Sequence, residues 1–352
     1  MSSFVKLGDL THIRTGKLDA NASSENGQYP FFTCSKEPLR IASYSYDCEC
    51  VLVAGNGDLN VKYYDGKFDA YQRTYIIESA DKRKLLVKYL YFFLDIYVEV
   101  LRTQSIGGVI KYIKLGNLTD ALIPLPSIER QAEIIECLEK CNTLIDKRQR
   151  QIALIEQTVK SRFIELFGNY DLTHPQESWA PIKEVGTVVG GATPKTDHDE
   201  YWGGSYRWIT PAELDADSGY IYDSVRKLTK AGVESCSLQE MPVGTVILSS
   251  RAPIGKVAIA GNTFYCNQGF KNIICKEGIT PRYLYTVLLL NVEYLNSLGR
   301  GATFKEISKG IVESIRIPVP SMELQEQFAA FVEQTDKSKL CGKMAVSYTH
   351  LR

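Results

Sequence analysis

The 352-residue sequence lacks the motifs by which most enzymes are identified. There is no phosphate-binding loop of the G-x-x-x-x-G-K-[ST] type, because Gly255-Lys256 has no glycine five positions upstream. The H-E-x-x-H and G-x-S-x-G motifs are absent, and so are the Asp-Pro-Pro-Tyr and Asn-Pro-Pro-Tyr signatures of adenine methyltransferases. The sequence therefore predicts no catalytic residues and argues against a stand-alone nuclease or methyltransferase.

Metal-binding spacing and long apolar runs are missing too. The nine cysteines include Cys48-Glu49-Cys50, which is not a C-x-x-C pair, and the four histidines are scattered, so we expect no metal site. An odd, scattered set of cysteines without a signal peptide is typical of the reducing cytoplasm. No apolar run approaches the roughly 20 residues of a membrane span, so we expect a cytoplasmic chain with no membrane contact.

An excess of positive charge is the third absence. The chain has 41 Lys and Arg against 41 Asp and Glu, a formal net charge of zero. A protein that binds nucleic acid by itself is usually basic. Any such role is therefore expected to depend on local patches and on a more basic partner.

What is present, first of all, is one long helix that follows Ser127. Pro124 and Pro126 prevent a helix before that residue, Ser127 is a favourable N-cap, and Gly168 is a natural end. Apolar residues recur every seven positions between these limits, which predicts a coiled-coil seam; they are Leu138, Ile145, Ile152, Val159 and Leu166. A buried core helix fits less well, because charged and amide residues occupy positions 147–151.

The opening of this helix occurs twice. Residues 317–323, IPVPSME, repeat residues 123–129, IPLPSIE, at a shift of 194. The same shift relates Gln131 to Gln325 and Lys111 to Lys305. A single ungapped register over about fifty residues indicates an internal duplication, and the period is too long for a solenoid.

Each copy is predicted to be an α+β globular domain followed by a helix. In the first copy we expect strands at 50–54, 61–64 and 73–77, a helix at 84–103, and a returning strand at 114–124. In the second we expect strands at 246–249, 256–260 and 272–275 and a helix that begins at Pro281. The predicted divisions are a first domain (1–122), a central spacer helix (123–168), a second domain (169–316), a shortened C-terminal spacer helix (317–340) and a tail (341–352). The tail matches nothing in the first copy, so either a foreign end or a divergent terminus would explain it.

Polar loops are the remaining feature. Arginine and amide side chains are the usual groups that contact base edges, whereas Lys, Ser and Thr side chains commonly hold phosphates. Taken singly, each loop is more simply a solvated surface. Four such loops in the second copy, at 190–210, 249–256, 267–271 and 300–305, without a catalytic set favour binding. The candidate DNA-binding residues are Arg251, Lys256, Asn267, Gln268, Lys271, Arg300, Thr303 and Lys305 in the second copy, and Gln72, Arg73, Gln104 and Lys111 in the first.

These loops resemble a known family. The G-x-T-P…Y-W-x-G…W-I-T run at 191–210, the Asn267-Gln268-x-Phe270 element and the I-P-x-P-S-x-E-x-Q helix start are similar to recurring pieces of the specificity (S) subunits of type I restriction–modification systems. In the first copy, residues 27–32 and 64–68 resemble a different variety of that family's target recognition domain. The resemblance covers residues 4–340.

The resemblance implies two target recognition domains, each for one half of a bipartite asymmetric DNA site, spaced by long antiparallel coiled-coil helices. It also implies that the helices dock modification subunits, through residues that include Leu138, Ile145, Ile152 and Val159, and that restriction subunits join the complex. No cofactor would bind to this chain, whereas S-adenosylmethionine, ATP and Mg²⁺ are implied for the partner subunits. The shortened second helix is the point at which the sequence departs from this plan.

A non-catalytic scaffold, in which the two globular domains bind protein partners, is the alternative. Salt-dependent binding to duplex DNA in the presence of modification subunits distinguishes the two hypotheses, because phosphate contacts release counterions.

Overall fold

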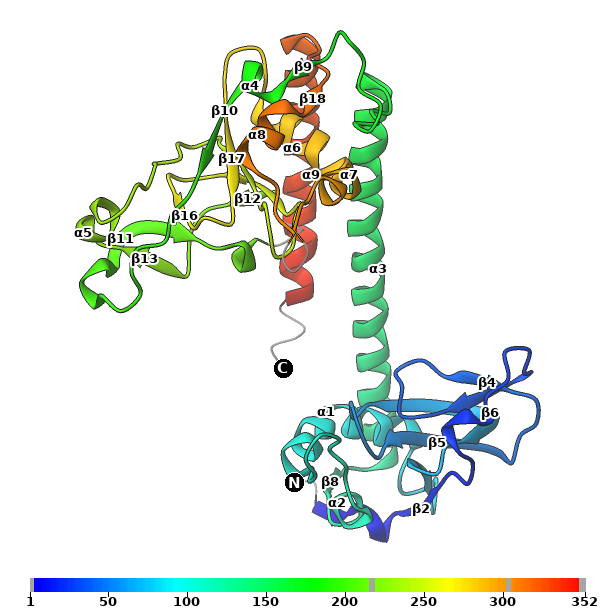
Figure 1. The fold of residues 1–352 in the computed structure, drawn as a ribbon. Helices are drawn as coiled ribbons and strands as arrows, with labels where there is room; N and C mark the ends of the chain where they lie inside the picture. The colour runs from blue at the N-terminus through cyan, green and yellow to red at the C-terminus, as the bar shows by residue number, and fades with distance from the viewer. Residues whose placement is uncertain (1–2, 215–218, 302–304, 348–352) are drawn as a thin grey trace. The chain divides into compact units, whose positions relative to one another are not determined.

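The computed structural model describes residues 3–214, 219–301 and 305–347. The chain divides into two compact units, residues 1–147 and residues 148–352, which are described here separately. Helix α3 (Ile128–Phe167) begins in the first unit and ends in the second (Figure 1). Within the described residues, none of the helices is long and apolar enough to span a membrane.

The first unit is built on a six-stranded sheet with the order β2-β7-β5-β6-β3-β4. Strand β3 is parallel to β6, the other neighbours are antiparallel, and β1 pairs separately with β8. The elements are β1 (Ser3–Lys6), η1 (Leu7–Asp9), β2 (Thr11–Thr15), η2 (Ala20–Ala22), β3 (Tyr29–Phe32), β4 (Leu39–Ile41), β5 (Tyr46–Ala54), β6 (Val61–Ala70), β7 (Thr74–Ser79), α1 (Val87–Gln104), α2 (Leu115–Thr119) and β8 (Leu122–Leu125).

Strand β5 is buried on both faces, which explains its nearly continuous apolar sequence. Side chains alternate across a strand, so Val51 and Val53 join the core beneath α1, whereas Cys50 and Leu52 join a second cluster on the opposite face. Full burial of a valine or leucine side chain contributes about 1.5–3 kcal/mol. The central strand therefore fixes the register of the sheet, because a slip of one residue would exchange the two faces.

The second unit has a five-stranded sheet with the order β10-β17-β14-β15-β12 and a separate three-stranded sheet, β13-β11-β16. Helix α6 packs on β14 and β15. The elements are β9 (Ala180–Pro181), α4 (Ile182–Val185), β10 (Gly186–Gly190), η3 (Asp199–Tyr201), β11 (Trp202–Ile209), η4 (Pro211–Glu213), β12 (Tyr220–Ile221), β13 (Arg226–Leu228), α5 (Lys230–Glu234), β14 (Val246–Leu248), β15 (Val257–Ala260), β16 (Tyr265–Cys266), β17 (Lys271–Cys275), α6 (Pro281–Leu290), α7 (Val292–Ser297), α8 (Lys309–Ser314), β18 (Arg316–Ile317) and α9 (Met322–Ser347).

The internal duplication is visible in hydrogen bonds as well as in sequence. The Tyr89 hydroxyl donates to the Pro124 carbonyl at 2.8 Å, and the Tyr283 hydroxyl donates to the Pro318 carbonyl at 3.0 Å, a shift of 194 at both ends. The strand order β2-β7-β5-β6 of the first unit corresponds to β10-β17-β14-β15 of the second. The two units are therefore two versions of one fold.

Most of the predicted elements are present, but one predicted strand is largely replaced by a helix. We expected a strand over 114–124, and residues 115–119 form helix α2 instead. The Asn117 side chain accepts a hydrogen bond from the Lys114 backbone N–H at 2.7 Å, which caps the turn, and Leu118 is fully buried. Only the last part of the expected strand is extended, as β8.

The two predicted domain boundaries each cut a short strand. Strand β8 pairs with β1 and strand β18 pairs with β9, so residues 123–125 and residue 317 lie in sheets rather than in spacer helices. The helices themselves begin at Ile128 and Met322. The second helix continues to Ser347, which is beyond the end that we expected at 340.

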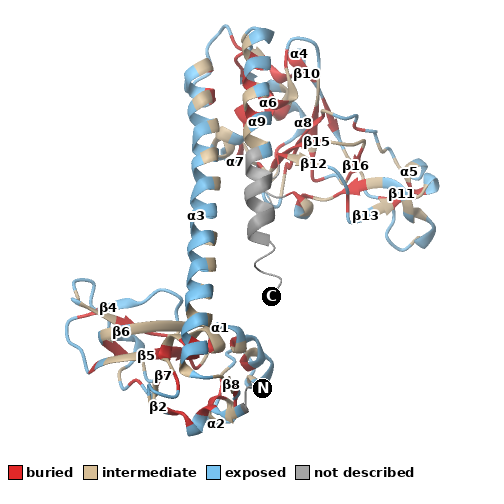
Figure 2. Cartoon of the chain, turned by 180° about the vertical axis from the view of Figure 1, so that it is seen from behind, coloured by how far each residue is buried: buried red, intermediate tan, exposed pale blue. Residues whose placement is uncertain are grey.

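Helix α3 has the ends that the sequence predicts. The Ser127 hydroxyl accepts a hydrogen bond from the Arg130 N–H at 3.4 Å, and Gly168 ends the helix with φ at +89°. The C-terminal end of α3 packs on the start of α9, where Phe163 and Phe167 contact Phe328 with ring centroids 5.3 and 5.7 Å apart. Figure 2 shows that most residues in the middle of α3 are exposed.

Candidate nucleic-acid interface

Three polar loops of the second unit meet at one end of its five-stranded sheet. Their backbones are tied together, because the Ser250 N–H donates to the Gly269 carbonyl at 2.8 Å and the Ile307 N–H donates to the Ser250 carbonyl at 3.0 Å. Arg300 and Glu306 exchange both backbone hydrogen bonds at 3.0 Å. The predicted residues Arg251, Lys271 (the first residue of β17) and Arg300 thus lie on neighbouring segments, although they are far apart in the sequence.

Glu306 is the centre of the charged groups in these loops, and sequence analysis missed it. Its Oε1 lies 3.0 Å from the Lys271 Nζ, and its Oε2 lies 4.0 Å from an Arg251 Nη. The Lys271 ammonium group also lies 3.3 Å from the Ser250 Oγ and 3.5 Å from the Gln268 carbonyl. Nothing in the sequence marks Glu306, because its partners are 35 and 55 residues away and only the fold brings them together.

The other candidates of the second unit fall into two groups. Lys256 donates to the Pro211 carbonyl at 3.1 Å, and the Asn267 side-chain oxygen accepts from the Gly269 N–H at 2.9 Å, so both groups have structural partners. Gln268, Arg300 and Lys305 are exposed, although the Gln268 oxygen accepts a hydrogen bond from Thr193. The predicted residue Thr303 lies outside the described residues.

The same backbone frame occurs in the first unit. The Gly55 N–H donates to the Arg73 carbonyl at 2.8 Å, the Ile113 N–H donates to the Gly55 carbonyl at 2.9 Å, and Ile106 and Tyr112 exchange both backbone hydrogen bonds. We call these matched hydrogen bonds the loop frame. In each unit it holds three loops beside the end of the central strands.

The candidates of the first unit are arranged around the loop frame. Arg73 and Lys111 are exposed, and the Lys111 carbonyl accepts a hydrogen bond from the Gly57 N–H at 2.9 Å. Gln72 and Gln104 have side-chain partners, since Gln72 donates to Asp19 at 2.8 Å and Gln104 accepts from Asn117 at 3.1 Å. Arg73 and Lys111 are therefore the more accessible cations of this set.

The predicted seam of α3 is half-buried along its length. Leu138, Ile145, Ile152 and Val159 are intermediate in exposure, and Val159 packs on the core cluster that contains Phe163 and Phe328. By contrast, Leu144 and Leu154, which lie outside the seam, are each 60% exposed. The seam residues are thus less accessible than these two leucines.

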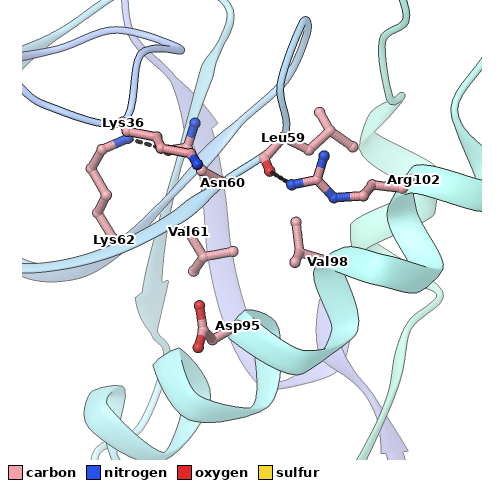
Figure 3. A pocket seen from close by; sticks show the side chains of 8 residues that line it. All are labelled: Lys36, Leu59, Asn60, Val61, Lys62, Asp95, Val98 and Arg102. Atoms are coloured by element: carbon pink, nitrogen blue, oxygen red, sulfur yellow. Dashed lines mark hydrogen bonds between the residues drawn. The ribbon is translucent and has the colours of Figure 1, made fainter. Parts of the chain in front are cut away.

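A pocket of about 260 Å³ lies between β6 and α1 in the first unit (Figure 3). Its positive charges are directed to acceptors of the protein: Arg102 donates to the Asp58 carboxylate at 2.7 Å, and Lys62 donates to the Asn60 side chain. Burial lowers the pKa of Lys62 and raises the pKa of Asp95. The pocket is lined by Lys36, Leu59, Asn60, Val61, Lys62, Asp95, Val98 and Arg102.

Ligands for a metal ion are not gathered anywhere in the described part of the chain. Among these residues there is no group of three or more His, Cys, Asp or Glu side chains that could hold such an ion. The arrangement of the loops is instead one of exposed cations and amides on a hydrogen-bonded backbone, which suits polyanion binding and base recognition.

Comparison with known proteins identifies the family. The sequence profile described as the type I restriction modification DNA specificity domain matches residues 2–157 and 177–341. The chain is 40% identical over 370 residues to the type I restriction enzyme EcoDI specificity subunit of Escherichia coli, a match that covers 94% of this chain and 80% of that subunit. It is 42% identical over 184 residues to the MjaIX specificity subunit of Methanocaldococcus jannaschii, which covers 51% of this chain and 42% of that subunit.

A solved structure has the same fold. The S subunit of a type I restriction–modification system from M. genitalium aligns with a TM-score of 0.66 and 15% sequence identity, over 99% of this chain and 92% of the other. Two matched segments of one profile correspond to the two units with the shared loop frame. The chain therefore belongs to the family of type I restriction–modification DNA specificity subunits.

Proposed function

We propose that each unit of this specificity subunit recognises one half of a bipartite, asymmetric site in duplex DNA. The observation that supports this proposal is the loop frame: it is the same in both units, whereas the side chains on it differ. A common backbone with different polar side chains is what two related domains need in order to bind two different base sequences. Half-sites of different sequence follow from the differences between the units.

The spacer helices have a separate proposed role. The spacer helices α3 and α9 run as an antiparallel coiled-coil pair, and they dock the modification subunits through residues of α3 that include Leu138, Ile145, Ile152 and Val159. The contacts of Phe163 and Phe167 with Phe328 are one end of this pairing. More basic partner subunits would supply much of the phosphate binding, which agrees with the zero net charge of this chain.

The chemistry belongs to partner subunits in this proposal. The modification subunits bind S-adenosylmethionine and methylate adenine, and the restriction subunits require ATP and Mg²⁺ for cleavage. The complex acts in the cytoplasm, where its DNA substrate is located. The chain itself supplies recognition and assembly.

Methylome sequencing of the source cell with and without this gene tests the proposal. We expect one bipartite motif to be methylated in the parent and unmethylated after deletion. An unchanged methylome would contradict the proposed function. Loss of a protein complex without loss of a methylated motif would instead favour a scaffold.

A further inference from the structure

Four positions on the loop frame have charged side chains in the second unit and uncharged ones in the first. The hydrogen bonds define the matches: Ser250 and Gly55 occupy the same place, and so do Gly269 and Arg73. Counting from these residues, the matched pairs are Arg251 with Asn56, Lys271 with Tyr75, Arg300 with Ile106 and Glu306 with Tyr112. The charged network is therefore an addition to the frame and is not required to build it.

Two cations of this network, Lys271 and Arg251, lie beside Glu306 and differ in how accessible they are to solvent. The Lys271 side chain is 14% exposed and has three oxygen neighbours, those of Ser250, Gln268 and Glu306. Arg251 is 36% exposed, and its guanidinium group is 4.0 Å from the other carboxylate oxygen. Glu306 is 40% exposed, so one carboxylate at the surface interacts with both cations.

We propose that Glu306 is a positioning residue that holds Arg251 and Lys271 back from DNA phosphates and so increases the preference of the second unit for its own half-site. This inference rests on the proposed function. The Glu306 carboxylate occupies the place beside the two cations that a phosphate would take on any DNA sequence. Only the base edges of the correct half-site then offer Arg251 hydrogen-bond acceptors that can replace the Glu306 carboxylate.

The physical reason is that phosphate contacts strengthen binding to every sequence equally. Each phosphate that a cation neutralises makes binding more salt-dependent by about 0.9 in the logarithmic slope, without adding discrimination. A carboxylate within 3.0–4.0 Å of two cations opposes such contacts by competing for the cations and by repelling the phosphate. Binding to unrelated DNA is thereby weakened more than binding to the cognate site.

Replacement of the carboxylate by its neutral isostere tests this role. The full chain, assembled with its modification subunits, is titrated with two duplexes at two salt concentrations: one contains the motif found by methylome sequencing, and the other contains a scrambled motif. For Glu306→Gln we expect roughly three- to tenfold tighter binding to the scrambled duplex, with a salt slope steeper by about one. Binding to the cognate duplex should change less than about twofold, so the specificity ratio falls.

Two controls separate positioning from general charge or folding effects. Glu313→Gln removes a carboxylate of the same unit that pairs with Lys309 on α8, and it should leave the ratio unchanged. In the Arg251→Gln/Lys271→Met background, Glu306→Gln should no longer tighten binding to the scrambled duplex, because the cations that it would release are absent. A structural role alone would not produce this dependence on the background.

Several outcomes overturn the inference. If Glu306→Gln weakens cognate binding and leaves scrambled binding and its salt slope unchanged, then Glu306 contacts a base itself. If Glu306→Gln and Glu313→Gln have equal effects, the cause is net charge. If the unaltered complex does not prefer the cognate duplex, the proposed function fails and this inference fails with it, which the wild-type titration reveals before any variant is made.

Discussion

Gln131 and Gln325 make the same three hydrogen bonds 194 residues apart. The Gln131 side chain accepts from the Leu86 N–H at 2.9 Å and donates to the carbonyls of Lys84 and Pro126 at 2.8 and 3.0 Å. Gln325 accepts from the Thr280 N–H at 2.8 Å and donates to the carbonyls of Gly278 and Pro320 at 3.0 and 2.9 Å. Both residues are fully buried, so each joins a spacer helix rigidly to its own globular unit.

Replacing either glutamine with alanine should therefore destabilise the unit that contains it. A buried backbone N–H left without an acceptor costs about 1–3 kcal/mol. We expect Gln131→Ala and Gln325→Ala each to lower the free energy of unfolding by about that amount in urea titrations. Gln149→Ala, at an exposed position of α3, is the control and should have an effect below about 0.5 kcal/mol. Wild-type stability in both glutamine variants would show that these hydrogen bonds do not hold the helices.

Lys305 and Arg300 should affect DNA binding in different ways. Both are exposed, but the matched residue in the first unit is Lys111 for the lysine and Ile106 for the arginine. A lysine shared by both units suits phosphate contact, so Lys305→Ala should weaken binding to all sequences and reduce the salt slope by about one. Arg300→Ala should weaken cognate binding selectively, by about 1–3 kcal/mol.

Titrations on cognate and scrambled duplexes at two salt concentrations separate these effects. Lys256→Ala and Lys271→Ala are informative comparisons, because those ammonium groups already have acceptors within the protein. We expect smaller changes in salt slope for them than for Lys305→Ala. Equal, sequence-independent losses for Lys305→Ala and Arg300→Ala would refute the division between the two residues.

The seam of α3 should be needed for assembly. Ile145 and Ile152 are half-buried in this chain, and full burial of such a side chain contributes about 1.5–3 kcal/mol. Ile145→Asp with Ile152→Asp should abolish co-purification with modification subunits, while circular dichroism and proteolysis show both units still folded. The matched control is Leu144→Asp with Leu154→Asp, at positions outside the seam. If the control pair abolishes co-purification and the seam pair does not, the docking surface lies on the more exposed side of the helix.

The thiol of Cys266 should report whether the loops of the second unit open. Burial raises the pKa of Cys266 to about 12, so the reactive thiolate is scarce at neutral pH. Alkylation of Cys266 should therefore be slow at pH 8, because the thiol is both buried and protonated. Cys137, which is exposed on α3, is the internal control in mass spectrometry. Labelling of Cys266 as fast as Cys137 at pH 8 would show that this part of the core is open in solution.

The sequence was sufficient for the parts of the fold that repeat or have strong end signals. The register that relates Gln131 to Gln325 predicted the duplication, and Ser127 and Gly168 predicted the ends of α3. The short helix α2 was not predictable from apolar spacing, because it depends on a cap by Asn117 and on burial of Leu118. Local propensity over five residues is too weak to decide such a case.

The sequence predicted which loops form the candidate site, but it did not predict the charge network around Glu306. Residue types that suit DNA indicated Arg251 and Lys271, and the structure places both beside Glu306. An acidic residue in such a loop has no sequence signal of its own, since its role depends on which cations the fold brings to it. The DNA contacts of the exposed candidates, including Arg73, Lys111 and Lys305, remain predictions.

The central claim is that each unit recognises its own half-site. Exchange of residues 1–126, which end at the start of α3, for the corresponding segment of another specificity subunit tests it most directly. Methylome sequencing should then show a methylated motif in which one half has a new sequence. The other half should keep both its sequence and its methylated adenine. A motif changed in both halves, or in neither, would contradict the account.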